Sequence, residues 1–169
     1  GAGSGIGRLL ALGAARRGAR IVIWDLDPVA GDTVRDEVRA AGGSAESFAL
    51  DVSNKEQVKQ VAAATGPVDV VVNNAGVVTG KNLLDASEEA IERTLRVNTL
   101  ALFWVTRAFL GGMIERRRGT VVTISSAAGL VGVAKQTDYS ASKHAAFGFA
   151  GSLRVELAKD NTGVNSLVV

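Results

Sequence analysis

The sequence of 169 residues contains no cysteine, one histidine and two prolines. The absence of cysteine excludes a disulfide framework and a thiolate metal site, and the lone His144 leaves no histidine-based cluster, so we predict no bound metal. No run reaches the roughly 18 unbroken apolar residues of a membrane span. Residue 1 already lies in a glycine-rich motif where a signal peptide would stand. We therefore expect a cytoplasmic protein.

The chain also lacks a large excess of either charge, since its formal net charge is only +2. The one dense basic run, Arg116-Arg117-Arg118, closes a predicted helix, where cations complement the negative end of the helix dipole. Aromatic residues make up only 5% of the chain, and none interleaves with a basic stripe as nucleic-acid binding would require. We predict no nucleic-acid partner.

Apolar residues are plentiful, at 47%, and short apolar runs alternate with helical stretches. The runs lie at 21–24, 46–50, 68–72, 120–124 and 164–169, and the helical stretches at about 6–17, 28–41, 54–64, 88–110 and 138–158. Continuous apolar strands separated by helices are typical of a parallel sheet covered on both faces. The prediction is an α/β, doubly wound, Rossmann-like fold in three α/β/α layers, forming a single domain over residues 1–169.

Both ends of the chain are abrupt. The glycine-rich start reads as a turn from strand to helix with no strand before it, and the last apolar run stops at Val169. We expect that a central first strand and a C-terminal part are missing. A chain of this extent should be poorly stable alone, because two neighbouring strands would lose a partner.

Glycines at positions 1, 5 and 7 form the pattern GxxxGxG before the first helical stretch. Glycine is required where a side chain would block a pyrophosphate or prevent a tight turn. The helix that begins near Ile6 directs its N-terminal amides and positive dipole at such phosphates. A purely structural turn is the alternative reading of these glycines.

Asp25 follows the next apolar run, at about the distance expected of a ribose-binding acid. A carboxylate there accepts hydrogen bonds from the adenosine ribose diol and repels a 2′-phosphate, and the nearby Ser4 and Leu26 are neutral. This favours NAD over NADP. The alternative is an aspartate that only caps the turn before Pro28.

Asn98 stands on an otherwise apolar helix face. Ile91, Leu95, Asn98, Leu102 and Val105 step by four, three, four and three residues. An amide buried there without partners would cost about 1–3 kcal/mol. Asn98 must therefore be satisfied by backbone, water or a functional network, and a structural role stays open.

Tyr139 and Lys143 stand four residues apart, on one face of a predicted helix. The nearby ammonium favours the phenolate and lowers the tyrosine pKa from its ordinary value near 10, as general acid–base work requires. Ser126 lies just past the run at 120–124, at the carboxyl end of a parallel strand where ligands bind, and Ser125 competes with it for the role. His144 points about 100° further round the helix and reads as a surface or packing residue.

Together these features resemble the short-chain dehydrogenase/reductase family, with its motifs in order and at close to its spacing from one end of the chain to the other. The matching pieces are Gly1-Ala2-Gly3-Ser4-Gly5-Ile6-Gly7, Asp51-Val52, Asn73-Asn74-Ala75-Gly76, Asn98, Ser125-Ser126 and Tyr139-Ser140-Ala141-Ser142-Lys143.

The resemblance implies a role for each position. Tyr139 would be the acid–base residue, Lys143 would hold the nicotinamide ribose, and Ser126, supported by Ser125, would bind the substrate oxygen, while Asn98 would anchor the water of a proton relay. The cofactor would be NAD, held by Gly1, Ser4, Gly5, Ile6, Gly7, Asp25, Asp51, Val52, Asn74, Ala75, Gly76, Tyr139 and Lys143. In the forward direction Tyr139 would take the alcohol proton while a hydride passes to the nicotinamide.

Within the family, Val22 to Asp25, Asn73 to Gly80 and Phe103-Trp104 resemble the retinol and 17β-hydroxysteroid dehydrogenase subgroup, which implies a secondary or lipophilic alcohol or ketone. The segment from Asp51 to Asn73 is about one helical turn shorter than in those relatives, Gly111-Gly112 stands where they often have a proline, and the family's Pro-Gly motif and substrate loop lie beyond Val169. The helices at 88–110 and 138–158 imply a homodimer or homotetramer, with Ala141, Ala145, Gly148 and Ser152 permitting close packing.

Three alternatives remain at this stage. An NADPH-dependent reductase of 3-oxoacyl thioesters would keep the fold and the catalytic residues, although Asp25 argues against it. A non-catalytic dinucleotide-binding regulator would have no need of Asn98, Ser126, Tyr139 and Lys143 together. Lastly, a chain of this extent could be inactive although its parent is an enzyme.

Overall fold

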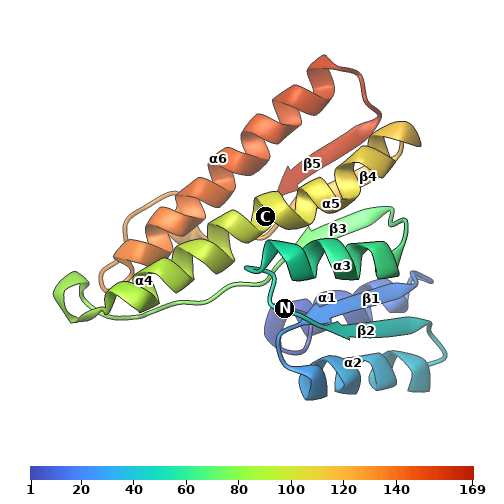
Figure 1. Cartoon of the computed structure of the whole chain (residues 1–169), viewed down its shortest axis with the longest axis horizontal. Coiled ribbons are helices and arrows are strands. Elements are labelled where there is room, and N and C mark those ends of the chain that lie inside the picture. Colours follow the sequence, from blue (N-terminus) through green and yellow to red (C-terminus); the bar gives the residue numbers. More distant parts are fainter. The chain divides into compact units, whose positions relative to one another are not determined.

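The computed structural model describes residues 1–169, which form two compact units, Gly1–Thr65 and Gly66–Val169 (Figure 1). Unit 1 contains α1 (Gly5–Ala15), β1 (Ile21–Asp25), α2 (Pro28–Ala40), β2 (Ala45–Ala49) and α3 (Lys55–Thr65). Unit 2 contains β3 (Val70–Asn73), η1 (Leu83–Asp85), α4 (Glu88–Leu95), η2 (Arg96–Leu100), α5 (Ala101–Glu115), β4 (Gly119–Thr123), η3 (Ala127–Gly129), α6 (Thr137–Lys159) and β5 (Val164–Val168). These bounds confirm the predicted alternation to within a few residues.

All strand pairs are parallel, which confirms the predicted α/β class. In unit 1, β1 pairs with β2, and in unit 2 the order is β3-β4-β5. Unit 1 thus contributes a two-stranded sheet and unit 2 a three-stranded one. The boundary between the units falls between Thr65 and Gly66, so whether residues 1–169 act as a single domain remains a prediction.

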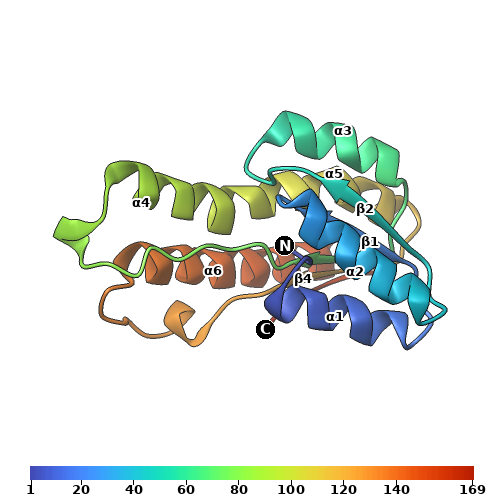
Figure 2. The same ribbon diagram turned by 90° about the horizontal axis from the view of Figure 1, so that it is seen from below.

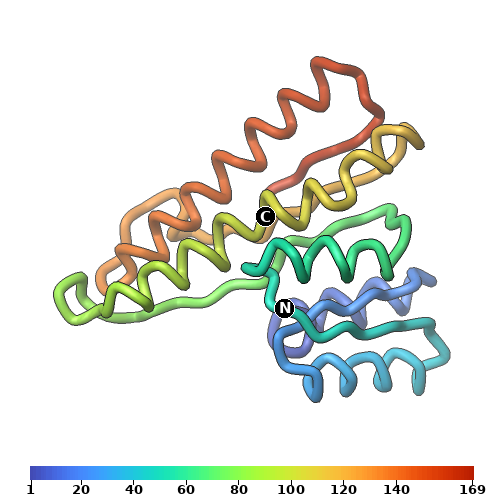
Figure 3. Tube along the Cα trace, viewed as in Figure 1, coloured from blue at the N-terminus to red at the C-terminus, as the bar shows by residue number.

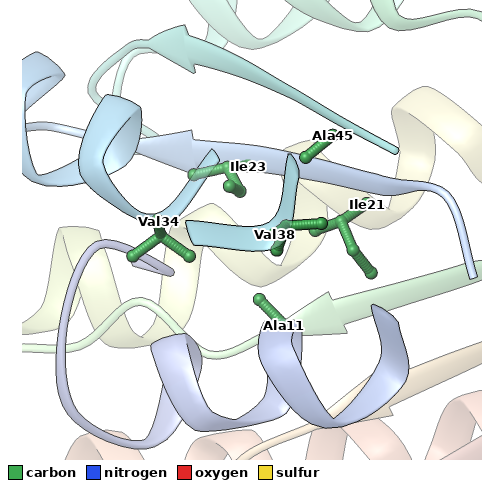
Figure 4. Close-up of a cluster of buried hydrophobic side chains, with 6 residues drawn as sticks. All are labelled: Ala11, Ile21, Ile23, Val34, Val38 and Ala45. Carbon is green, nitrogen blue, oxygen red and sulfur yellow. The ribbon is translucent and has the colours of Figure 1, made fainter. Parts of the chain in front are cut away.

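Unit 1 is built around β-branched side chains. Ile21 and Ile23 of β1 meet Val34 and Val38 of α2 and Ala11 of α1 (Figure 4). Ile23, Val34 and Val38 are fully buried. Helix α2 begins at Pro28, whose fixed backbone suits a first helical position, and the Asp27 carboxylate caps it by accepting from the amides of Val29 and Ala30.

In unit 2, α5 packs on β3 and β4 while α6 packs on β4 and β5, and α4 runs beside α6 (Figures 1 and 2). Side chains of one face of the sheet, such as Val71, Val121 and Val164, are buried beneath these helices. On the other face Val70, Val72 and Leu167 are exposed. Within this unit α5 and α6 thus cover the buried face of the sheet.

One continuous helix runs from Glu88 to Glu115, and its middle turn, η2, is a π-helix. The wide turn changes the phase of the buried face, so Thr94 is buried ahead of Asn98 and the predicted Leu95 is 39% exposed. The predicted stripe is thus wrong at Leu95 and correct at Leu102 and Val105, while Ile91 is partly buried. This helix is long and apolar enough to cross a membrane, but buried core helices also meet these two criteria.

Candidate active site

The segments that follow β3 and β4 leave the same edge of the unit 2 sheet. Asn73, the last residue of β3, lies opposite Thr123, the last residue of β4. The carboxyl ends of parallel strands are the usual place for ligands. Asn73 itself is buried and donates from Nδ2 to Thr106 Oγ1 at 3.1 Å, so it supports this edge from within.

Asn98 is 1% exposed and lies in the π turn η2. Its Oδ1 accepts from the Val77 amide at 2.8 Å, and its Nδ2 donates to Val77 O at 2.8 Å and to Ser142 Oγ at 3.0 Å. The amide predicted to need partners therefore has them. Because both Nδ2 protons are used, a relay water could bind this side chain only at the remaining lone pair of Oδ1.

Lys143 is 5% exposed, and its Nζ donates to the Ile124 carbonyl at 2.8 Å. The same Nζ stands 3.8 Å from the position that a Cβ on Gly76 would occupy, and that position is 3.4 Å from Asn98 Oδ1. Gly76, Asn98 and Lys143 are thus brought together. Burial lowers the pKa of Lys143 from its ordinary value of 10.5.

The lowered pKa of Lys143 predicts a change of stability with pH. Between the folded-state pKa and 10.5 the unfolded chain binds more protons than the folded protein, so the free energy of unfolding should rise with pH across that window. In Lys143→Met this contribution disappears. Urea unfolding of both proteins at several pH values measures the difference, and identical pH slopes would contradict the prediction.

Tyr139 lies in the first turns of α6 and is partly buried. Its ring centroid is 5.7 Å from Lys143 Nζ, so the four-residue spacing does bring the phenol and the ammonium to one face. The Tyr139 carbonyl accepts from Ser142 Oγ at 2.7 Å, and Ser142 is fully buried. Ser142 thereby links Tyr139 to Asn98, a role that the sequence did not reveal because a serine inside a helix has no distinctive pattern.

The two serines after β4 have different surroundings. Ser125 is buried and donates from Oγ to the Lys143 carbonyl at 3.0 Å. Ser126 is partly buried, and its Oγ accepts from the Ala128 amide at 3.1 Å as the cap of η3, so its own proton is left for another acceptor. This arrangement favours Ser126 as the substrate-binding serine and Ser125 as its support.

The remaining predicted residues of unit 2 follow β3 directly. Asn74 and Ala75 are partly buried and Gly76 is exposed. His144 is exposed, and its Nδ1 lies 2.9 Å from the Ser140 carbonyl, which confirms it as a surface residue.

The glycine-rich turn lies in unit 1, before α1. Gly5 has a φ of +51°, which favours glycine, and nothing would contact a Cβ there. Gly7 is buried inside α1, while Gly1 and Ile6 are exposed. Ser4 occupies the N-cap position but makes no side-chain cap bond, and the first turn of α1 carries no acidic residue. This helix end therefore suits an anionic group.

Asp25 is tied to the same turn. Its Oδ2 accepts from the Gly3 amide at 2.7 Å and its Oδ1 from the Asp27 amide at 3.0 Å, so it does brace the turn before Pro28. Burial acts to raise its pKa, but these two amides and the amino terminus outweigh it and lower the pKa below 3.8. A carboxylate has about four lone-pair positions, and the two amides and the Gly1 amino group at 3.5 Å engage three of them, which leaves one for a ribose hydroxyl.

Gly3 is a position that the glycine pattern did not single out. A Cβ there would stand 2.7 Å from Ala30 Cβ and 3.0 Å from Asp25 Oδ2. Only the structure reveals this close approach, because Ala30 is remote in sequence. Asp51 and Val52 also lie in unit 1 and are partly buried, and Asp51 Oδ1 accepts from the Ser53 amide at 2.8 Å.

A family model described as short chain dehydrogenase matches residues 1–169. The chain belongs to the short-chain dehydrogenase family. The chain is 45% identical over 175 residues to mouse epidermal retinol dehydrogenase 2, covering all of this chain and 57% of that protein. It is 41% identical over 162 residues to estradiol 17-beta-dehydrogenase 11 of Pongo abelii, covering 94% of this chain and 54% of the relative. These relatives confirm the predicted subgroup, although the chain spans less than two thirds of their length.

Solved structures of short-chain dehydrogenases share the fold. A metagenomic short-chain oxidoreductase in complex with NADP is 38% identical with a TM-score of 0.91, over 99% of this chain and 76% of that one. The F189W actinorhodin polyketide ketoreductase with NADPH is 36% identical with a TM-score of 0.94, over 99% of this chain and 66% of that one.

Proposed function

We propose that this short-chain dehydrogenase transfers a hydride between a nicotinamide dinucleotide and a secondary or lipophilic alcohol or ketone. The observation that carries the proposal is the buried Lys143, whose Nζ is held at the Ile124 carbonyl, 5.7 Å from the centre of the Tyr139 ring. Burying a lysine ammonium costs desolvation free energy, and a purely structural role does not require a charged group at this position. Perturbed ionisable groups of this kind concentrate at functional sites.

Unit 1 carries the residues that fit a dinucleotide phosphate. The uncapped start of α1, with an open approach at Gly5 and no nearby acid in the first turn, offers backbone amides and the positive end of the helix dipole. Asp25 has a lone pair left for a ribose hydroxyl. When bound, the dinucleotide accepts or supplies the hydride, and the protein supplies binding and proton transfer.

In the proposed oxidation, Tyr139 takes the proton of the alcohol. Ser126 uses its free hydroxyl proton to hold the substrate oxygen. The Lys143 ammonium favours the phenolate form of Tyr139, which accepts this proton and becomes a neutral phenol, since the two side chains lie on one face of α6. Asn98 holds the backbone of Val77 and, through Ser142, the backbone of Tyr139, so it maintains the spacing of these groups.

For the cofactor we propose NAD, because the Asp25 carboxylate would repel the 2′-phosphate of NADP. An NADPH-dependent reductase of 3-oxoacyl thioesters is the alternative, and the solved structures with NADP or NADPH support it. A regulator that binds the dinucleotide without turnover is the remaining alternative.

The experiment that separates these functions is titration calorimetry with NAD and NADP, followed by turnover of secondary and lipophilic alcohols. We expect a preference for NAD that Asp25→Ala reduces by about tenfold, since charge-assisted hydrogen bonds to the ribose are lost. Asp27→Ala is the matched control, because it removes the cap of α2 and costs about 1 kcal/mol of stability without touching the ribose-binding acid.

The other results have distinct meanings. A preference for NADP would contradict the Asp25 argument and favour the thioester reductase. Binding without turnover of any alcohol or ketone would favour the regulator. Binding of neither dinucleotide would contradict all three functions.

We propose further that the protein is cytoplasmic and forms a homodimer or homotetramer through the helix Glu88–Glu115 and α6. In support, the small residues of α6, Ala141, Ala145, Gly148 and Ser152, are all exposed. Phe103 and Phe147 on the same two helices are 42% and 44% exposed. Light scattering in solution tests the assembly.

A further inference from the structure

Asp138 is a buried carboxylate that the proposed mechanism does not use. It lies directly before Tyr139 in the first turn of α6 and is only 7% exposed. Buried carboxylates are rare unless they are paired or hydrogen-bonded. No basic side chain forms an ion pair with it. Its partners are therefore hydroxyl and amide groups.

The main partner comes from the segment that follows β3. Thr79 Oγ1 donates to Asp138 Oδ2 at 2.5 Å, and it lies 3.2 Å from Thr94 Oγ1 of α4. Figure 3 shows this segment running along the α4–α6 pair before it turns back into α4. Asp138, Thr79 and Thr94 thus join α6, the segment and α4 at one point.

The charge state of Asp138 fits this arrangement. Burial acts to raise its pKa, but hydrogen bonds from Thr79, Thr94 and the backbone amides of the first helical turn outweigh burial, so its pKa lies below 3.8. At neutral pH the group is a carboxylate, which accepts hydrogen bonds and donates none. The single hydroxyl proton of Thr79 is then directed at α6.

The first turn of α6 has little other support on its own side. Its N-cap residue, Gln136, makes no side-chain cap bond. The bonds of Ser142 and Lys143 hold α6 one turn further along. Ser142 reaches back to the Tyr139 carbonyl, and Asp138 is the side chain of the first turn itself that ties this turn to the segment after β3.

We propose that Asp138 and Thr79 form a clamp that positions Tyr139 for proton transfer, a role that rests on the proposed function. The segment after β3 is held at two points, at Val77 by Asn98 and at Thr79 by Asp138. The first point fixes the backbone beside Gly76 and Lys143, and the second fixes the turn that bears the phenol. Asp138 and Thr79 are positioning residues, since they act through Tyr139.

The first test does not depend on activity. Tyr139 is the sole tyrosine of the chain, so tyrosine labelled with carbon-13 gives one ring signal in an NMR spectrum. Thr79→Val removes the hydroxyl at nearly constant volume and is expected to shift and broaden that signal. Thr79→Ser keeps the hydroxyl and should restore the wild-type signal. Asp138→Asn keeps one carbonyl oxygen and should have an intermediate effect.

Thr162→Val is the matched control. The Thr162 hydroxyl is buried and donates to the Leu157 carbonyl at 3.1 Å, at the opposite end of the same helix. Its loss should lower the melting temperature about as much as Thr79→Val but leave the Tyr139 signal unchanged. Equal shifts of the signal in both variants would show that Asp138 and Thr79 contribute only to overall stability, which would overturn the clamp.

The second test uses turnover. Because misplacing a reacting group by about 1 Å can cost a hundredfold, Thr79→Val should lower kcat by about tenfold or more, with KM for the dinucleotide nearly unchanged. An active wild type with unchanged kcat and an unchanged Tyr139 signal in Thr79→Val would overturn the clamp and leave the proposed function standing. An inactive wild type would overturn the proposed function and, with it, the catalytic purpose of the clamp, while the NMR result would still decide whether the clamp holds Tyr139.

Discussion

Tyr139→Phe is expected to lower kcat by about 10²–10⁴-fold, which is the usual contribution of a positioned acid–base group. The substitution removes one oxygen atom and keeps the ring, whose centre lies 5.7 Å from Lys143 Nζ. The phenol oxygen makes no hydrogen bond in the folded protein, so its removal should change the melting temperature little. Dinucleotide binding should also persist, since phosphate and ribose are held elsewhere. Steady-state kinetics and calorimetry on the same preparation measure both quantities.

The two serines provide the comparison for Tyr139→Phe. Ser126→Ala should lower kcat while leaving the fold nearly intact, because only the cap of the short η3 turn is lost. Ser125→Ala should instead lower stability by about 1 kcal/mol, the ordinary contribution of a buried hydrogen bond. A Tyr139→Phe protein that retains wild-type kcat would refute the assignment of the acid–base residue.

Gly129→Ala is expected to cost about 2–3 kcal/mol of stability and to lower activity together with it. Gly129 ends η3, and a Cβ there would stand 2.7 Å from both the Lys143 carbonyl oxygen and Ser125 Oγ. The first contact is with the backbone of α6, which cannot rotate away from the new methyl group as a side chain could. Either η3 or α6 must therefore move, and Lys143 moves with α6. Urea unfolding and kcat measured on one sample report the two losses.

Gly151→Ala is the same chemical change at a place where nothing lies within 4 Å of the new methyl group. Gly151 is inside α6, where alanine is the better helix former, so stability should rise by about 0.5–1 kcal/mol. A loss of similar size in both variants would show that the contact at Gly129 is not the cause.

The sequence predicted the elements well because their signals are local. Apolar runs of four to six residues became strands, and the helix bounds differ from the predicted ones by a few residues. Tyr139 and Lys143 were also predictable, since a helix fixes the relation between positions four apart. The pairing of Lys143 with the Ile124 carbonyl was not, because it joins elements that no short-range pattern connects.

Two features were beyond prediction for a definite physical reason. The π turn at Arg96–Leu100 has no distinctive composition, so the predicted apolar stripe includes Leu95 in place of the buried Thr94. The link between Thr79 and Asp138 spans 59 residues, and neither residue type indicates it. Contacts that depend on tertiary packing appear only when the packing is known.

Because of the π turn, the two halves of the helix Glu88–Glu115 present their buried faces in directions that differ from those of a regular helix. An α-helix turns by about 100° per residue, so inserting one residue rotates everything beyond it by that amount. Here the wide turn absorbs the rotation: α4 presents Thr94 toward α6, and α5 presents Val105 toward the sheet, with Asn98 between them. Deleting Val97 to give a regular helix would leave its length and composition almost unchanged, yet one half would face the wrong way. The position of Asn98 is therefore encoded in the number of residues in this helix as much as in their kinds.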